Sequence, residues 1–90
     1  MEPIVEIDVS RVRSGEELHQ LLYEKLNFPE YYGSNWGAFN ECIADPDLNL
    51  PKHVRIRGID SLTKKLPRDA ALLRKCTAYP TVIPKFEWCL

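Results

Sequence analysis

The pattern of hydrophobic and polar positions predicts strands that alternate with pairs of helices. Three short segments, residues 4–9, 53–57 and 86–90, carry β-branched or aromatic residues in runs or in strict alternation, which is typical of strands. In the second of them, Val54 and Ile56 fall on one face. Two helical segments separate each strand from the next, so the strands are joined by crossovers and are expected to form a parallel sheet.

The first predicted helix begins at Ser14, because Glu17 three residues later completes a capping box. It ends before Pro29, since proline disfavours helix at the residue before it. Its apolar stripe recurs at helical spacing and consists of Leu18, Leu21, Leu22 and Leu26.

The second predicted helix follows a turn at residues 31–33 and is capped by Ser34 or Asn35 through a side-chain oxygen. A helical wheel of ~100° per residue separates an inner side from an outer side. The inner side holds Ala38, Phe39, Cys42 and Ile43. The outer side, where a partner has room to bind, holds Gly37, Asn40, Glu41, Ala44 and Asp45.

Two more helices are expected between the second and third strands. Asp60 or Ser61 is expected to cap a short one, and Pro67 suits the first turn of the next. The predicted fold is therefore α/β, a small three-stranded parallel sheet flanked by about four helices. Residues 1–90 are predicted to form one domain, because this length supports one modest core.

Composition is that of an ordinary globular protein, with 44% hydrophobic and 28% charged residues. The first ten residues contain acids and no basic segment followed by an apolar run, and no stretch approaches the ~20 apolar residues of a membrane span. We therefore expect a soluble, cytoplasmic protein.

Charge is unevenly distributed along the chain. Residues 1–50 contain ten acids and three bases, a net charge of −7, whereas residues 51–90 contain nine bases and three acids, a net charge of +6. This asymmetry predicts a dipolar molecule that steers a charged partner to one side. The alternative is two independently solvated surfaces.

Three cysteines, Cys42, Cys76 and Cys89, are widely spaced and form no C-x-x-C pair. Two histidines cannot complete a zinc pattern with them, so no metal or cofactor is expected. We interpret the cysteines as small buried hydrophobic residues, with a redox or nucleophilic role as the alternative.

The segment from residue 26 to residue 43 contains five of the nine aromatic residues of the chain. No Lys or Arg occurs from Leu26 to Pro51, whereas four acids do: Glu30, Glu41, Asp45 and Asp47. Aromatic anchors beside carboxylates favour a surface that binds a positively charged protein.

Two other classes of function have weaker support. An enzyme would need an acid–base pair such as Glu30 and Glu41 with His19, but no catalytic motif occurs and His19 is expected to be exposed or partly packed on the first helix. Direct nucleic-acid binding would need clustered bases, and the aromatic segment is acidic instead.

The segment PEYYG at residues 29–33, with Asn35, Ala38 and Cys42 after it and Leu18-His19-Gln20 before it, resembles the barstar family of ribonuclease inhibitors. The resemblance extends to the residue types themselves over residues 14–43. In the rest of the chain it is limited to length and to the order of the elements. It implies a barstar-like fold, no catalysis, and inhibition of a ribonuclease by plugging its active site.

The resemblance also implies which residues bind the partner. Glu41 stands at the position of the family's central acidic residue and stands in for a substrate phosphate. Tyr31, Gly33 and Asn35 match interface positions of the family as well. With neighbouring residues of the second predicted helix added, the complete set of expected partner-binding residues is Tyr31, Gly33, Asn35, Trp36, Gly37, Asn40, Glu41 and Asp45.

Three departures from the family pattern change the expected partner. Gly37 replaces an acidic residue, Asn40 replaces an aromatic one, and residues 75–78 lack a carboxylate that the family supplies. We therefore expect a monomeric immunity protein that binds one basic, secreted or delivered nuclease toxin, different from the family namesake's, without contacting nucleic acid or a membrane. The alternative is a barstar-like module for a non-ribonuclease toxin or another basic protein.

Overall fold

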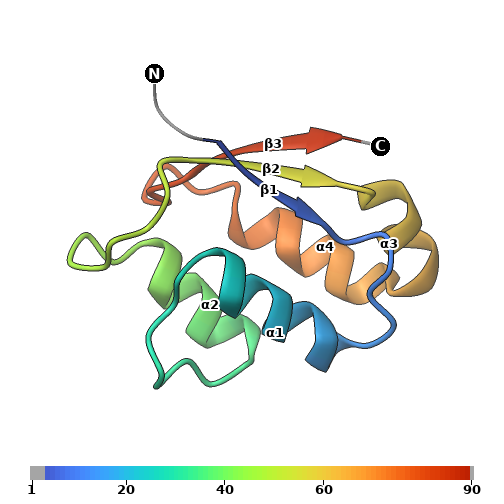
Figure 1. Ribbon diagram of the computed structural model, residues 1–90, viewed down its shortest axis with the longest axis horizontal. Coiled ribbons are helices and arrows are strands. Elements are labelled where there is room, and N and C mark those ends of the chain that lie inside the picture. The colour runs from blue at the N-terminus through green and yellow to red at the C-terminus, as the bar shows by residue number, and fades with distance from the viewer. Residues whose placement is uncertain (1–3, 90) are drawn as a thin grey trace.

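The computed structural model describes residues 4–89, and its elements follow the predicted order (Figure 1). The strands are β1 (Ile4–Asp8), β2 (His53–Arg57) and β3 (Lys85–Cys89). The helices are α1 (Gly15–Lys25), α2 (Trp36–Ile43), α3 (Ile59–Lys65) and α4 (Pro67–Cys76). Leu90, which was expected to end the third strand, lies outside the described residues. The predicted α/β fold with three strands and four helices is confirmed.

The sheet is parallel throughout, with β2 between β1 and β3. Its register places Val5 beside Val54, and Val54 beside Phe86. Figure 1 shows α1, α2 and α4 on one face of the sheet and α3 near the end where the strands finish. The molecule therefore has two layers, and within residues 4–89 no helix covers the second face of the sheet, which we call the bare face.

The core lies between the sheet and the helices. Val54 and Ile56 are completely buried, as the alternation in β2 predicts. Ile4 was predicted to lie in a buried strand, but 42% of it is exposed. Successive side chains of a strand point to opposite faces of the sheet. Ile4, Glu6 and Asp8 of β1 therefore share the face that no helix covers, and all three are exposed. Of the predicted apolar stripe, Leu18, Leu22 and Leu26 have no exposed surface, whereas Leu21 is half-buried at the edge of the core.

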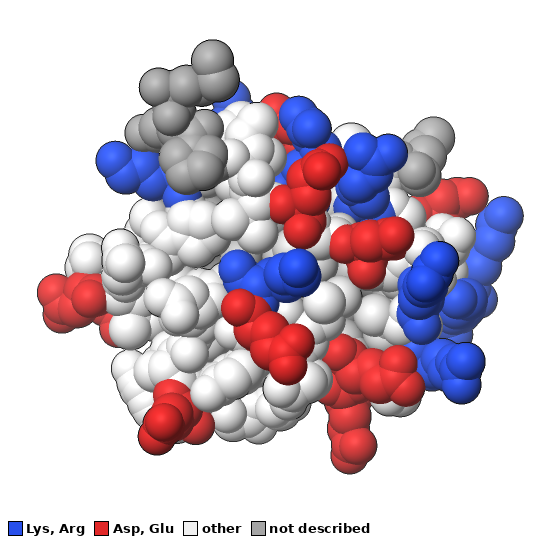
Figure 2. Space-filling model, viewed as in Figure 1, with Lys and Arg blue, Asp and Glu red and all other residues white. Residues whose placement is uncertain are grey.

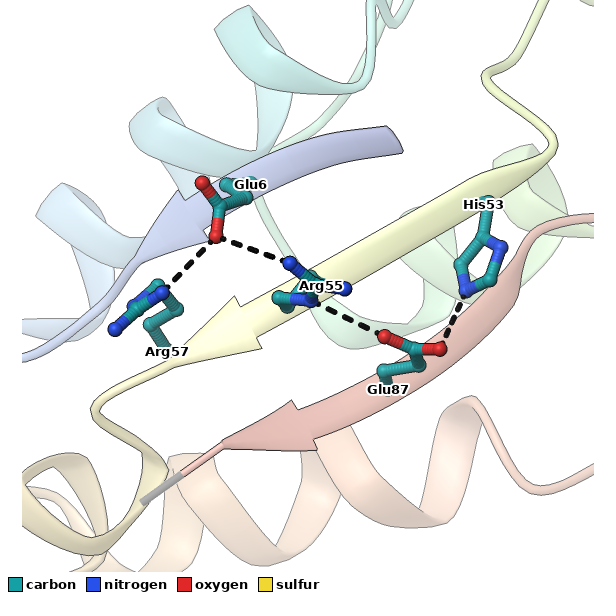
Figure 3. A network of polar contacts seen from close by, with 5 residues as sticks. All are labelled: Glu6, His53, Arg55, Arg57 and Glu87. Atoms are coloured by element: carbon teal, nitrogen blue, oxygen red, sulfur yellow. Dashed lines mark hydrogen bonds and ion pairs between the residues drawn. The ribbon is translucent and has the colours of Figure 1, made fainter. Parts of the chain in front are cut away.

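On the bare face of the sheet, charged side chains of the three strands form a network of ion pairs (Figure 3). Glu6 of β1 lies 3.1 Å from Arg57 and 3.5 Å from Arg55. Glu87 of β3 lies 3.1 Å from Arg55 and 2.9 Å from His53. Hydrogen bonds from Arg57 and Arg55 respectively lower the pKa of Glu6 and of Glu87. Part of the basic second half of the chain is thus neutralised within this face.

The capping box of α1 forms in a modified way. The Glu17 backbone N–H donates to Ser14 Oγ at 3.2 Å, as predicted. The Glu17 carboxylate, however, accepts from the N–H of Arg13 at 3.2 Å, one residue before the cap. Both bonds hold the start of α1 and therefore the direction in which the helix leaves β1.

The predicted cap of α3 at Asp60 or Ser61 is wrong. The N-cap is Gly58, which adopts a left-handed conformation with φ 78° and offers no side-chain cap. The chain turns directly after β2 at this glycine, so the helix begins at Ile59. Ile59 is only 2% exposed, and its burial anchors the first turn of α3 in the core.

Candidate functional site

The connection between α1 and α2 forms the tyrosine turn (residues 27–35). It begins at Asn27 and nears its end at Ser34, and both adopt positive φ angles, 58° and 52°. Asparagine tolerates the left-handed conformation that closes a helix, because its short polar side chain forms local hydrogen bonds. The turn is tightened by the Tyr32 N–H, which donates to the Pro29 carbonyl at 3.0 Å.

Asn35 joins the tyrosine turn to α2. Its Oδ1 accepts from the N–H of Ala38 at 2.8 Å, which is the cap predicted for this helix. Its Nδ2 donates to the carbonyl of Gly33 at 3.2 Å. Both ends of the Asn35 amide therefore make bonds within the chain, and this side chain shapes the turn in which Tyr31 is presented.

Tyr32 attaches the tyrosine turn to α1 through its buried side chain. Tyr32 is 8% exposed, and its hydroxyl is hydrogen-bonded to His19 Nδ1. Its ring also packs against Phe28, with centroids 4.8 Å apart. His19 was expected to be exposed or partly packed, yet it is only 4% exposed. The polar partner on Tyr32 allows the imidazole to be buried without an unsatisfied nitrogen at Nδ1.

Trp36 links α2 to both neighbouring helices. Its ring lies 4.5 Å from His19 and 5.2 Å from Phe39, measured between centroids. Its Nε1 donates to the Asp69 carboxylate of α4 at 3.0 Å. The start of α2 is thus held between α1 and α4, so the outer face of α2 rests on a rigid support.

The burial of His19 makes the stability of the fold depend on pH. Burial lowers the pKa of His19 below its ordinary 6.5, although Asp69 acts in the opposite direction. As the pH falls through 6.5, the unfolded chain therefore takes up a proton at His19 before the folded chain does. The free energy of unfolding then decreases until the pH reaches the lower pKa of the folded state. Burial also raises the pKa of Tyr32, which moves its ionisation further from neutral pH.

We expect urea denaturation to give a lower free energy of unfolding at about pH 5.5 than at about pH 7.5, and His19→Gln to remove most of that difference. This interval lies above the ordinary pKa of 4.5 of the glutamates whose pKa is lowered, so they contribute little there. Equal pH dependence in the wild type and in His19→Gln would contradict this assignment.

On the outer side, the structure gathers three of the expected binding residues around one hollow. Tyr31, 67% exposed, lines it together with Glu41 of α2 and Asp45, two residues after the end of α2. The hollow has a volume of about 180 Å³, and its remaining wall includes Tyr32 and Ala38. We call it the Glu41 hollow.

A second hollow of about 280 Å³ lies between α2 and α4. Gly37 and Asn40 line it from α2, and Lys75 lines it from α4, with Tyr79 just beyond that helix. Trp36 forms part of its wall. We call it the Lys75 hollow. The expected binding residues thus divide between two hollows on either side of α2, while Gly33 and Asn35 lie in the exposed part of the tyrosine turn.

Sequence reasoning assigned no binding role to Lys75 or Tyr79. Tyr79 is 51% exposed beside the Lys75 hollow, which is unusual for a large aromatic ring. The sequence does carry a signal for Tyr79. It stands after a predicted helix and directly before Pro80, which places this aromatic residue in a loop, where exposure is expected. Lys75 gives no such signal, since lysine is common in the last turn of any helix.

The acidic residues around α2 keep their charge uncompensated. Between residues 4 and 89, no ion pair involves the four acids of the base-free segment, Glu30, Glu41, Asp45 and Asp47. Asp45 makes one local bond, accepting the N–H of Asp47 at 2.9 Å. In Figure 2, a group of Lys and Arg side chains lies at the end of the molecule where α3 lies, and others are scattered over the rest of this face. The arrangement suits attraction of a cation-rich surface to α2.

Other kinds of site have less support in the described part of the chain. Residues 4–89 contain no group of three His, Cys, Asp or Glu side chains placed to hold a metal ion. Cys42 is buried, and Cys76 and Cys89 are half-buried; burial raises the pKa of Cys42 and Cys76, which disfavours the reactive thiolate. No helix within the same range is long and apolar enough to cross a membrane.

The protein-family model described as "Barstar (barnase inhibitor)" matches residues 2–79 of the chain. The match extends from β1 to the residues just after α4 and so includes every residue named above for the two hollows.

Proposed function

Because the chain belongs to the barstar family, an inhibitor family, we propose that it is a cytoplasmic immunity protein that inhibits a ribonuclease toxin by covering the active site of the enzyme. The single observation that carries the proposal is the Glu41 hollow. There an exposed tyrosine and two carboxylates without ion-pair partners in residues 4–89 lie together on a rigid support.

The chemistry of ribonucleases explains why such a surface inhibits them. An enzyme that binds RNA phosphates presents Arg and Lys, and these side chains bind a carboxylate in the same way. In the proposed complex, Glu41 occupies the place of a phosphate, and Tyr31 covers the rim of the cleft with a large ring at low rotamer cost. Chain ordering on binding costs little, because Trp36 and Asn35 already hold the turn and helix in place.

The experiment that tests this function has two steps. The immobilised protein is used to capture its partner from the source cells, with Glu41→Ala and Asp60→Ala as matched acid-removing variants; Asp60 lies on α3. A captured protein that depends on Glu41 and not on Asp60 is then assayed for cleavage of a fluorogenic RNA. Titration with the wild-type chain should abolish cleavage with a sharp endpoint at one inhibitor per enzyme. If the captured protein has no ribonuclease activity, the proposal is wrong, and the chain binds another basic effector instead.

Association with the ribonuclease is expected to slow steeply as salt is raised, because the attraction by the uncompensated acids is screened over a Debye length of ~10 Å at ~0.1 M salt. Dissociation is expected to change much less, since contacts within the formed complex are shielded from solvent ions. Stopped-flow association rates at several salt concentrations measure both effects. An association rate that is independent of salt would show that these acids create no steering field.

A further inference from the structure

The Lys75 hollow arises from two small residues on α2. Gly37 contributes no side chain, and Asn40 one helical turn on contributes a short amide, so the groove between α2 and α4 stays open. The two helices are nevertheless fixed to each other by the bond from Trp36 to Asp69. The hollow is therefore a formed feature of the surface and has a volume of about 280 Å³.

Lys75 places a positive charge in this hollow. Its neighbour Arg74 turns toward the sheet, where its guanidinium carbon lies 5.3 Å from the Trp88 ring centroid. Lys75 is exposed, and no carboxylate in residues 4–89 forms an ion pair with it. Its charge is felt locally, because it opposes the effect of burial on the pKa of the adjacent Cys76.

We propose that the Lys75 hollow receives a carboxylate side chain, aspartate or glutamate, that projects from the ribonuclease partner. This inference rests on the proposed function and specifies the chemistry of the partner. Lys75 supplies the opposite charge. Asn40 and Tyr79, whose side chains carry hydrogen-bond donors, also line the hollow. The volume of about 280 Å³ is ample for one aspartate or glutamate side chain and lies just below the ~300–1,000 Å³ of ordinary small-molecule pockets.

A protein carboxylate fits better than a nucleic-acid phosphate. Asn40 in the Lys75 hollow is followed directly by Glu41, which lines the other hollow with Asp45. A polyanion entering beside Lys75 would pass these two acids and be repelled. A partner protein can instead place one acid opposite Lys75 and its basic residues opposite Glu41. Two adjacent hollows of opposite charge would fix the register of the complex and reject partners with the wrong pattern.

The test is a charge reversal at Lys75. It should change the affinity in opposite directions depending on whether a partner carboxylate occupies the hollow. If no partner carboxylate enters the hollow, Lys75→Glu adds negative charge near a basic enzyme and should tighten the complex. If the carboxylate is there, Lys75→Glu should raise the Kd at least about tenfold, and Lys75→Gln several-fold, through like-charge contact or loss of the pair. Lys64→Glu makes the same charge change on α3 and serves as the control.

The captured ribonuclease provides the second arm. Single Asp→Lys and Glu→Lys substitutions on its surface are paired with Lys75→Glu, and one of them should restore most of the lost affinity. Circular dichroism verifies folding, and Lys75→Gln replaces Lys75→Glu if the latter does not fold. Unchanged or tighter binding by the Lys75 variants, while the wild type still inhibits stoichiometrically, would overturn this inference alone. Lys75-dependent binding of a single-stranded RNA oligonucleotide would also overturn it, and failure of the wild type to inhibit any ribonuclease would overturn the proposed function.

Discussion

Glu41→Ala is expected to weaken binding to the ribonuclease by ~2–5 kcal/mol, roughly 30- to 4,000-fold in Kd, a range drawn in part from the barnase–barstar complex of the same family. Glu41 is exposed on α2 and lines the Glu41 hollow beside Tyr31. In a basic cleft its removal leaves partner cations buried without an opposite charge, which adds to the loss. Isothermal titration or inhibition kinetics measures the change.

The fold should be unaffected, because Glu41 is exposed and takes part in no ion pair in residues 4–89. Thermal denaturation of Glu41→Ala is therefore expected to match the wild type within about 0.5 kcal/mol. Glu41→Gln keeps the shape and should recover little affinity if the negative charge replaces a phosphate. Asp45→Ala, at the half-buried edge of the same hollow, should cost less than about 1 kcal/mol. Affinity near the wild-type value for both Glu41 variants would remove Glu41 from the centre of the proposed interface.

The order and type of every element could be predicted because each carries a local signal. Val54 and Ile56 alternate with polar residues in β2, and the leucines of α1 recur at helical spacing. These signals depend only on which face of an element is buried. The bare face of the sheet was not foreseen, since a run such as Ile4–Val5 reads the same whether one or both of its faces are covered.

Contacts between distant segments were the part that could not be predicted. The Trp36–Asp69 bond joins residues from two helices that only the tertiary fold brings together. The same holds for the Lys75 hollow, whose walls come from α2, α4 and the loop after α4. His19 was misjudged for this reason as well: its neighbours on α1 left its burial undecided, and the hydroxyl that satisfies it comes from Tyr32 in the next segment.

Gly58 controls a place where the ends of all three strands meet. Its N–H donates to the carbonyl of Cys89, which ends β3, at 3.0 Å, and Ser10 after β1 lies against its α-carbon. A β-carbon at Gly58 would lie 2.6 Å from Ser10 Cβ and 2.9 Å from the Ser10 backbone nitrogen. Because the second contact is to backbone, no side-chain rotation can relieve it.

Gly58→Ala is therefore expected to lower the free energy of unfolding by at least about 2 kcal/mol. A φ of 78° costs a residue with a β-carbon ~1–2 kcal/mol, and the contact with Ser10 adds to it. For a chain of this size the melting temperature should fall by about 8–16 °C. Gly15→Ala is the matched control, because Gly15 has no positive φ and its added β-carbon would approach only the end of the Asp69 side chain, at 3.3 Å. That variant should change stability by less than about 1 kcal/mol. Equal stability of the two variants in urea denaturation would mean that the chain relaxes at Gly58 without cost, and that the junction of the three strands is not held by this glycine.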